Sequence, residues 1–294
     1  MKLFLHRVLV VLVVLLLCNL GILFYIDEVY YKPYNESEFS EKTFLLADSH
    51  GLHLYDYPKQ YGVKNFSFAG DSYVDLYRKL DFLLRNAQVD TVLLTVDDHI
   101  LGTYRDFNNN HNRSIYYASS SCFKNSYEFM KEKHLRYNIA LFQPEVALLL
   151  RRKFFVNYFQ WIDLKENKKE TKVNWSVLNK KDRVKKSRNR AFLQFDGHQK
   201  SQTQEDALDS IIVLCKKHQV ELIGLKFPLA KEYLDILEGR NFGADSIFHT
   251  HNLPVLDFTT LYIEQSEMFI NQDHLNDRGA QAFTEVLFAA LKRK

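Results

Sequence analysis

The sequence predicts an α/β protein in which helices cover both faces of a parallel sheet. Short apolar runs of strand character alternate along the chain with segments of helical period, which is the order of β-α-β units. The chain of 294 residues can hold one such domain of about 250 residues. Its residues are 46% hydrophobic and 26% charged, a balance typical of a globular protein with a sizeable core.

The first element is an apolar segment at residues 8–26. A helix of this length, at about 1.5 Å per residue, crosses a hydrocarbon core of about 30 Å. Lys2 and Arg7 precede the segment, and Asp27 follows it. Because positive charge marks the cytoplasmic flank, we expect residues 1–31 to form a single-pass anchor in the cytoplasmic membrane. The N-terminus would lie inside, and the rest of the chain would be extracytoplasmic.

Two other interpretations of this segment stay open. A cleaved signal peptide also has an apolar run, but this run is longer than usual and no small-x-small cleavage site follows it. A lipoprotein would use Cys18, yet the three residues before it are leucines and none is small. The length of the run favours the uncleaved anchor.

The following elements are predicted from apolar patterning. After a polar stalk, the continuous β-branched run at 91–96 is typical of a strand buried on both faces. Ser72 is a plausible N-cap for a helix whose leucines recur at helical spacing. The predicted strands are residues 43–47, 63–70, 91–96, 220–227 and 254–258, and the predicted helices are residues 72–86, 204–218 and 280–292.

Residues from about 98 to 200 interrupt this alternation, so we predict an insertion within a domain that spans residues 32–294. Within it, residues 165–190 carry eleven Lys or Arg against three acids. This stretch is either a patch that faces anionic lipid head groups or an acidic glycan, or a solvated loop with a frayed helix. The sequence leaves both interpretations open.

Composition also bears on partners and cofactors. A formal net charge of +3, with no zinc-finger spacing and no RNA-binding aromatic motif, predicts no nucleic-acid partner. His50, His53 and His99 could suggest a metal site, but they lack the spacing of known metal motifs. We therefore predict no metal and no cofactor. The sequence leaves the oligomeric state open.

Ser49 is the first candidate for chemistry. It lies two residues past the first predicted strand, and ligands bind beyond the carboxyl ends of strands in open parallel sheets. Backbone N–H groups at such a junction can stabilise the oxyanion of an acyl-transfer intermediate. Gly70, which closes the second predicted strand, could supply another N–H because no Cβ blocks the approach.

His274 is the second candidate. It lies in the loop before the last predicted helix, at the same edge of the sheet, where it can take a proton from Ser49. Asn271 and Asp273 flank it. Either could orient the imidazole, and the spacing of three residues favours Asn271.

These residues resemble the sequence blocks of the SGNH (GDSL-like) hydrolase superfamily. The segment 47–50, Ala-Asp-Ser-His, is similar to the first block, usually Gly-Asp-Ser. Gly70 is similar to the glycine of the second block, and the segment 271–274 is similar to the last block, usually Asp-x-x-His. The resemblance covers residues 43–100 and 204–292 and leaves the predicted insertion outside it. It looks closest to membrane-anchored members linked to cell-envelope polysaccharides, including relatives of alginate O-acetyltransferases.

The resemblance implies a three-layer α/β/α flavodoxin-like fold, no metal, and ester hydrolysis or acyl transfer through an acyl-serine. It also implies that Ser49 is the nucleophile and His274 the general base. Two positions depart from the pattern. Asp97 or Asp98 stands where the third block has an oxyanion-stabilising Asn, and Asn271 replaces the orienting acid.

Two functions are therefore expected from the sequence. The first is an extracytoplasmic serine-dependent O-acyltransferase or esterase that acts on acetyl esters of a cell-envelope glycan. The second is a non-catalytic glycan-binding or assembly protein that retains the fold. Geometry discriminates between them, because catalysis requires Ser49 Oγ and His274 Nε2 to lie about 3 Å apart.

Overall fold

The computed structural model describes residues 1–26, 28, 39–136 and 175–292. The chain divides into two compact units. One comprises residues 1–38 and 115–168, and the other residues 39–114 and 169–294. Most of the predicted stalk and the first half of the basic stretch lie outside the described residues. The predicted boundaries, an anchor at 1–31 and a domain at 32–294 with an insertion at about 98–200, stay predictions.

The first unit contains the N-terminal helix α1, Lys2–Ile26. Its mean hydropathy reaches 2.9, and its length and composition are sufficient to cross a membrane. Most of its large apolar side chains are exposed, and Ile26 at its end is buried. The same unit contains the short helical segments η3 (Ser120–Cys122), α7 (Ser126–Phe129) and η4 (Met130–Leu135).

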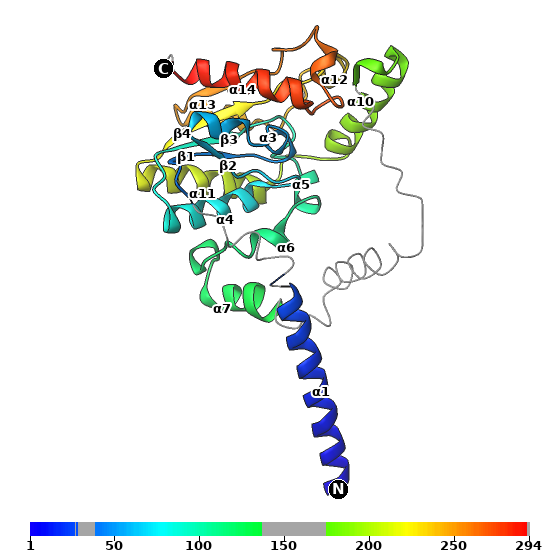
Figure 1. The fold of residues 1–294 in the computed structure, drawn as a ribbon, viewed down its shortest axis with the longest axis vertical. Helices are drawn as coiled ribbons and strands as arrows, with labels where there is room; N and C mark the ends of the chain where they lie inside the picture. The colour runs from blue at the N-terminus through cyan, green and yellow to red at the C-terminus, as the bar shows by residue number, and fades with distance from the viewer. Residues whose placement is uncertain (27, 29–38, 137–174, 293–294) are drawn as a thin grey trace. The chain divides into compact units, whose positions relative to one another are not determined.

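The second unit is built on a five-stranded parallel sheet (Figure 1). Its strands are β1 (Thr43–Leu46), β2 (Val63–Asn65), β3 (Thr91–Thr95), β4 (Glu221–Lys226) and β5 (Val255–Asp257). The spatial order is β2-β1-β3-β4-β5. This 2-1-3-4-5 order is that of flavodoxin-like doubly wound sheets. The predicted α/β class with a parallel sheet is confirmed.

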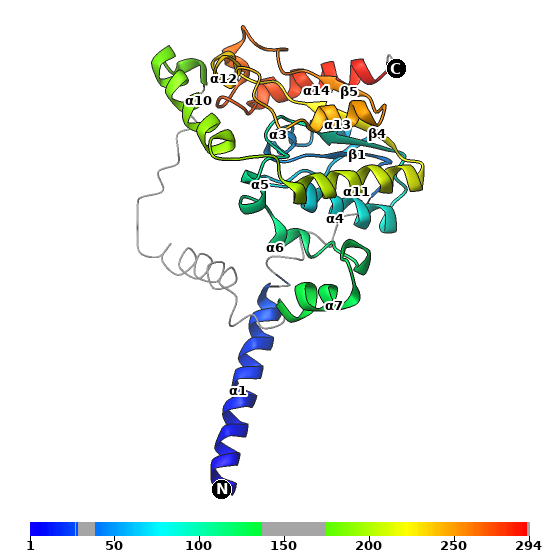
Figure 2. The same ribbon diagram turned by 180° about the vertical axis from the view of Figure 1, so that it is seen from behind.

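Helices cover both faces of this sheet (Figures 1 and 2). Helices α4 (Tyr73–Asn86) and α11 (Gln202–His218) lie on one face, and α13 (Ala244–Thr250) and α14 (Asp277–Leu291) lie on the other. Alternate strand residues such as Leu45 and Ile223 share a buried apolar cluster with Phe283 and Leu287 of α14. Burying both faces explains why the central strands are apolar throughout.

The second strand is shorter than the sequence predicts. β2 ends at Asn65 instead of Gly70, although Phe66 still donates its N–H to the carbonyl of Leu45. Beyond that point the side chain of Asp71 accepts the N–H of Phe68 at 3.2 Å. A side-chain acceptor thus replaces the next strand partner, and the chain leaves the sheet as a loop.

The remaining helical segments of this unit are α3 (Ser49–Leu52), η2 (Tyr57–Tyr61), α5 (Tyr104–Phe107), α6 (His111–Ser114), η6 (Trp175–Val177), α10 (Lys180–Phe195), α12 (Lys231–Leu237) and η7 (Ser266–Met268). Helix α10 contains the second half of the basic stretch and packs against α12. Ala191 and Phe195 of α10 share an apolar cluster with Tyr233 and Leu237. This half of the stretch is therefore a packed helix and not a solvated loop.

Gly279 is expected to be required for the docking of α14. A Cβ at this position would lie 2.1 Å from the carbonyl oxygen of Met268, which is backbone and has little freedom to move. We expect Gly279→Ala to lower the free energy of unfolding by about 1–3 kcal/mol. Urea unfolding of the full chain in detergent measures this change. The control is Gln281→Ala on the exposed side of the same helix, which should stay within about 0.5 kcal/mol of the wild type. An unchanged Gly279→Ala would contradict the packing described.

Candidate active site

Ser49 and His274 meet at the carboxyl ends of the strands. The chain leaves β1 at Leu46, and Asp48 caps α3 by accepting the N–H of His50 at 3.0 Å. This turn places half-buried Ser49 at the start of α3. The hydroxyl Oγ of Ser49 lies 2.8 Å from Nε2 of His274. The structure therefore brings together two residues that are 225 positions apart in the chain.

The loop before α14 fixes the ring of His274. Nδ1 of His274 lies 3.0 Å from Oδ1 of Asn271 and 3.2 Å from Oδ1 of Asp273. The same Asn271 oxygen accepts the backbone N–H groups of Asp273 and His274 at 3.1 and 2.9 Å. Two acceptors at Nδ1 require the proton on that nitrogen. The lone pair of Nε2 then faces Ser49.

Asp273 is a buried carboxylate with cationic partners. Oδ2 accepts a hydrogen bond from Nε of Arg190 at 2.6 Å, and Oδ1 accepts one from the side chain of Gln272 at 3.0 Å. Burial by itself raises the pKa of Asp273, but the charges of His274 and Arg190 hold that pKa well below its usual range. Asp273 is therefore negatively charged at neutral pH, next to the imidazole that it contacts.

A second charged cluster surrounds Asp48, the residue that precedes the serine in the chain. Asp48 is fully buried, forms an ion pair with Arg105, and lies 3.2 Å from Nε2 of His99. Burial raises the pKa of Asp48, whereas the charges of His50 and Arg105 hold it well below its usual range. The capping residue of α3 is thus an anion held in place by a guanidinium.

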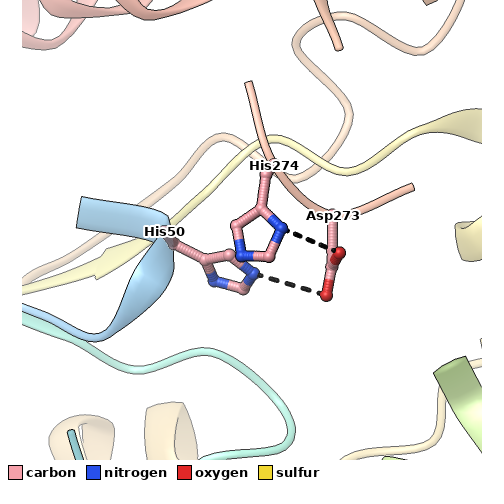
Figure 3. A group of neighbouring side chains, drawn as sticks. All are labelled: His50, Asp273 and His274. Carbon is pink, nitrogen blue, oxygen red and sulfur yellow. Dashed lines mark ion pairs between the residues drawn. The ribbon is translucent and has the colours of Figure 1, made fainter. Parts of the chain in front are cut away.

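His50 lies between the two clusters. Its Nδ1 lies 2.7 Å from Oδ2 of Asp97, and its Nε2 lies 3.9 Å from Oδ2 of Asp273. Figure 3 shows the carboxylate of Asp273 beside the rings of His50 and His274, with one oxygen toward each. Burial lowers the pKa of His50, but Asp48 and Asp97 raise it well above its usual value. His99 differs, because burial lowers its pKa to about 4.

The carboxylate at the third-block position does not stand alone. Asp97 accepts hydrogen bonds from the hydroxyl of Thr95 at 2.8 Å and from the N–H of Phe227 at 3.0 Å, in addition to its pairing with His50. Asp98 pairs instead with Lys226 at 2.5 Å, and burial raises the pKa of Asp98 to about 6. Both oxygens of Asp97 are therefore engaged with protein donors.

Gly70 adopts a φ of 89°, which favours glycine. The Asn110 side chain flanks it and donates to the carbonyl of Ala69 and to Asp71, each at 2.7 Å. Asn65 ties the same loop to α3 by donating to the carbonyl of Gly51 at 2.8 Å. Within the described residues no hydrogen bond joins Gly70 to Ser49, so the role of both residues in an oxyanion hole stays a prediction.

Two buried triads could be compared with metal sites. The ligand atoms of His50, Asp273 and His274, and those of Asp48, His50 and Asp97, lie within 4.8 Å of one another. In both triads, ligand atoms of the residues other than His50 already have partners. Guanidinium groups contact Asp48 and Asp273, and a hydroxyl contacts Nε2 of His274. A metal ion would lie against these fixed positive charges, so this donor set does not fit one.

Arg190 and Arg105 were not identified from the sequence. Arg190 lies 83 residues from Asp273 and in the predicted insertion, where it is one of eleven basic residues. Arg105 is 57 residues from Asp48. No motif spacing marks either residue, because only the packing of α10 and α5 directs their side chains inward.

No family model and no curated protein matches the chain. A structure from Bacteroides fragilis NCTC 9343, described as an acylhydrolase, has a TM-score of 0.43 and 9% identity, and covers 90% of this chain and 95% of its own. A GDSL-like lipase from Bacteroides thetaiotaomicron VPI-5482 has a TM-score of 0.41 and 9% identity, and covers 90% and 98%. Likenesses this low carry no argument about activity.

Proposed function

We propose that this chain is a serine-dependent esterase or O-acyltransferase that acts on acetyl esters of a cell-envelope glycan. The observation that carries the proposal is the 2.8 Å contact between Ser49 Oγ and His274 Nε2, with acceptors on the far nitrogen of the same ring. This is the nucleophile, base and orienter arrangement of acyl-transfer enzymes. The proposal that the ester is an acetyl ester and that the substrate is a glycan rests on the family resemblance of the sequence blocks around both residues.

The geometry supports a double-displacement mechanism. Nε2 of His274 takes the hydroxyl proton as Ser49 Oγ attacks the ester carbonyl, and the resulting bond from oxygen to carbon gives a tetrahedral oxyanion. The same Nε2–H then protonates the departing sugar oxygen, which leaves an acyl-serine. Water or a second sugar hydroxyl then gives its proton to Nε2 and attacks the acyl-serine, and Ser49 Oγ leaves and regains its proton. The N–H groups of Ser49 and Gly70 are the proposed oxyanion donors.

Two residues divide the task of orienting His274 in this proposal. Asn271 fixes the loop, because one oxygen accepts two backbone N–H groups and faces Nδ1. Asp273 adds the negative charge that stabilises the imidazolium formed when the serine loses its proton. The acid that the sequence blocks lack at position 271 is thus supplied from position 273.

The proposed location follows from α1. A helix of this length and hydropathy anchors the chain in the cytoplasmic membrane, and its basic N-terminal flank favours an N-terminus inside. The catalytic unit would then work outside that membrane, where envelope glycans are modified.

A fluorophosphonate probe tests the proposal. Such a probe reacts only with a serine activated by a base. We expect it to label the full chain in detergent at one residue, Ser49, and Ser49→Ala to abolish labelling. Ser246→Ala, which removes an exposed serine from α13, is the matched control and should label as the wild type does. Equal labelling of wild type and Ser49→Ala, or none of either, would favour the alternative of a non-catalytic glycan-binding or assembly protein.

A further inference from the structure

The proposed mechanism gives no role to His50, although this residue lies within the site. It follows the serine directly in the chain and is 4% exposed. Its ring centre lies 5.1 Å from that of His274 and 5.4 Å from that of His99. Within the described residues, Nε2 of His50 has no hydrogen-bond partner, and it is directed at Asp273 across 3.9 Å. A buried polar atom without a partner calls for an explanation.

The buried charges around His50 indicate that its ring is positively charged, which attracts Nε2 toward Asp273 even without a hydrogen bond. The cluster contains three carboxylates, Asp48, Asp97 and Asp273. Arg105 pairs with Asp48 and Arg190 pairs with Asp273, but no guanidinium contacts Asp97 in the described structure. An uncompensated buried carboxylate is costly. His50, at 2.7 Å from Asp97, is the cation that balances the set.

His99 is a neutral counterpart in the same cluster. Its Nε2 lies 2.9 Å from a guanidinium nitrogen of Arg105 and 3.2 Å from Oδ2 of Asp48, so it faces a cation and an anion that already pair with each other. Burial also lowers the pKa of His99 to about 4. The two imidazoles therefore differ in surroundings: His50 lies against Asp97, which has no guanidinium partner in the described structure, whereas the carboxylate next to His99 is already paired with Arg105.

We propose that His50 remains a buried imidazolium throughout turnover and acts as a positioning residue for the Ser49–His274 pair. Its Nδ1–H donates to Asp97, and its positive charge attracts the carboxylate of Asp273 across the 3.9 Å between Nε2 and Oδ2. Its positive charge also raises the electrostatic potential at the Ser49–His274 pair, since the two imidazole rings lie 5.1 Å apart. This inference rests on the proposed function for the roles of Ser49 and His274.

The charge on His50 has a measurable consequence for pH dependence. The polar and titratable groups that surround His50 and His274 come from several elements. They are Asp48, Ser49 and His53 around α3; Asp97, His99 and Arg105 from the β3–α5 segment; Arg190 from α10; Tyr233 from α12; and Asn271 and Asp273 from the loop before α14. Removing Arg105 or Arg190 with its anion would delete the α3 cap Asp48 or the orienting Asp273, whereas His50 can be removed together with its own anion, Asp97. The double variant His50→Gln/Asp97→Asn thus keeps the cluster neutral.

The experiment uses the full chain in detergent with 4-nitrophenyl acetate as the ester. In His50→Gln/Asp97→Asn, a cation whose ring lies 5.1 Å from that of His274 is lost together with the more distant anion that pairs with it, so the potential at the Ser49–His274 pair becomes less positive. We expect the acid limb of the kcat/KM profile to move to higher pH by about one unit. His99→Gln is the matched control, because it removes a neutral imidazole from the same cluster, and its acid limb should not move.

A second measurement keeps the inference testable if the double variant does not fold. In nitrogen-15 NMR of the histidine-labelled full chain, both ring nitrogens of His50 should be protonated at pH 7, with His50→Gln used for assignment. A neutral His50, or an acid limb that stays in place in the double variant, overturns the inference. Failure of the proposed function is separate, because it shows as absent labelling of Ser49 while the charge of His50 is still read by NMR.

Discussion

Replacing His274 with alanine is expected to lower kcat for ester hydrolysis by about 10³-fold and to leave KM nearly unchanged. His274 Nε2, 2.8 Å from Ser49 Oγ, is the base that the structure places against the hydroxyl. Without it, the serine must lose its proton to water. Because the base acts in the transition state and not in substrate binding, the loss falls on kcat. Steady-state hydrolysis of 4-nitrophenyl acetate by the full chain in detergent measures both constants.

The control for this variant is His249→Ala, which removes an exposed histidine from α13. It should retain wild-type kcat. The rate of fluorophosphonate labelling should fall in His274→Ala in parallel with kcat, because the same proton transfer limits both reactions. If His274→Ala kept more than about a tenth of the wild-type kcat, another group would have to be the base.

The second large effect is expected for Asp273→Asn. This substitution keeps the size of the side chain and removes the charge between His274 and Arg190. We expect kcat to fall by about 100-fold, since the imidazolium formed in the transition state loses its anion. We also expect the free energy of unfolding to fall by about 2 kcal/mol, because Arg190 keeps a mostly buried guanidinium without its carboxylate. Kinetics and urea unfolding of the same preparation report the two losses separately.

Asn271→Ala is the comparison for that variant. It removes an oxygen that three N–H groups share but removes no charge. Its loss of stability should therefore resemble that of Asp273→Asn, whereas its loss of kcat should be smaller. The reverse order of kcat would make Asn271 the main orienter, as the spacing in the sequence suggests.

The acid side of the stability profile should depend on the same carboxylates. The pKa values of Asp48 and Asp273 are held well below the unfolded value by cations, so the native state binds fewer protons than the unfolded state in the acidic range. Their stabilising effect is full above the unfolded pKa and is lost as pH falls through the folded pKa. The contribution of His50 to stability depends on pH in the opposite direction, because its pKa is raised in the folded state. This contribution is full below about pH 6.5 and is lost as pH rises through the folded pKa.

Most of the sheet could be predicted from the sequence. The runs at 43–47, 91–96 and 220–227 lie within one residue of β1, β3 and β4, because strands buried on both faces need continuous apolar residues. The capping residue Ser72 was also identified, since its side chain reaches the N–H of Asp75 within the same turn. The end of β2 was not predicted correctly, because it depends on the hydrogen bond that the Asp71 side chain accepts from Phe68.

The candidate site likewise has one part that the sequence predicts and another that only tertiary packing decides. The sequence by itself determined the positions of Ser49 and His274 at one edge of the sheet, because parallel strands place their carboxyl ends together and local turns follow them. Only the tertiary structure decided the charges around the pair. Arg190, Arg105 and His50 reach their carboxylates through the packing of separate elements, and no spacing along the chain records a contact made across 47 to 83 residues.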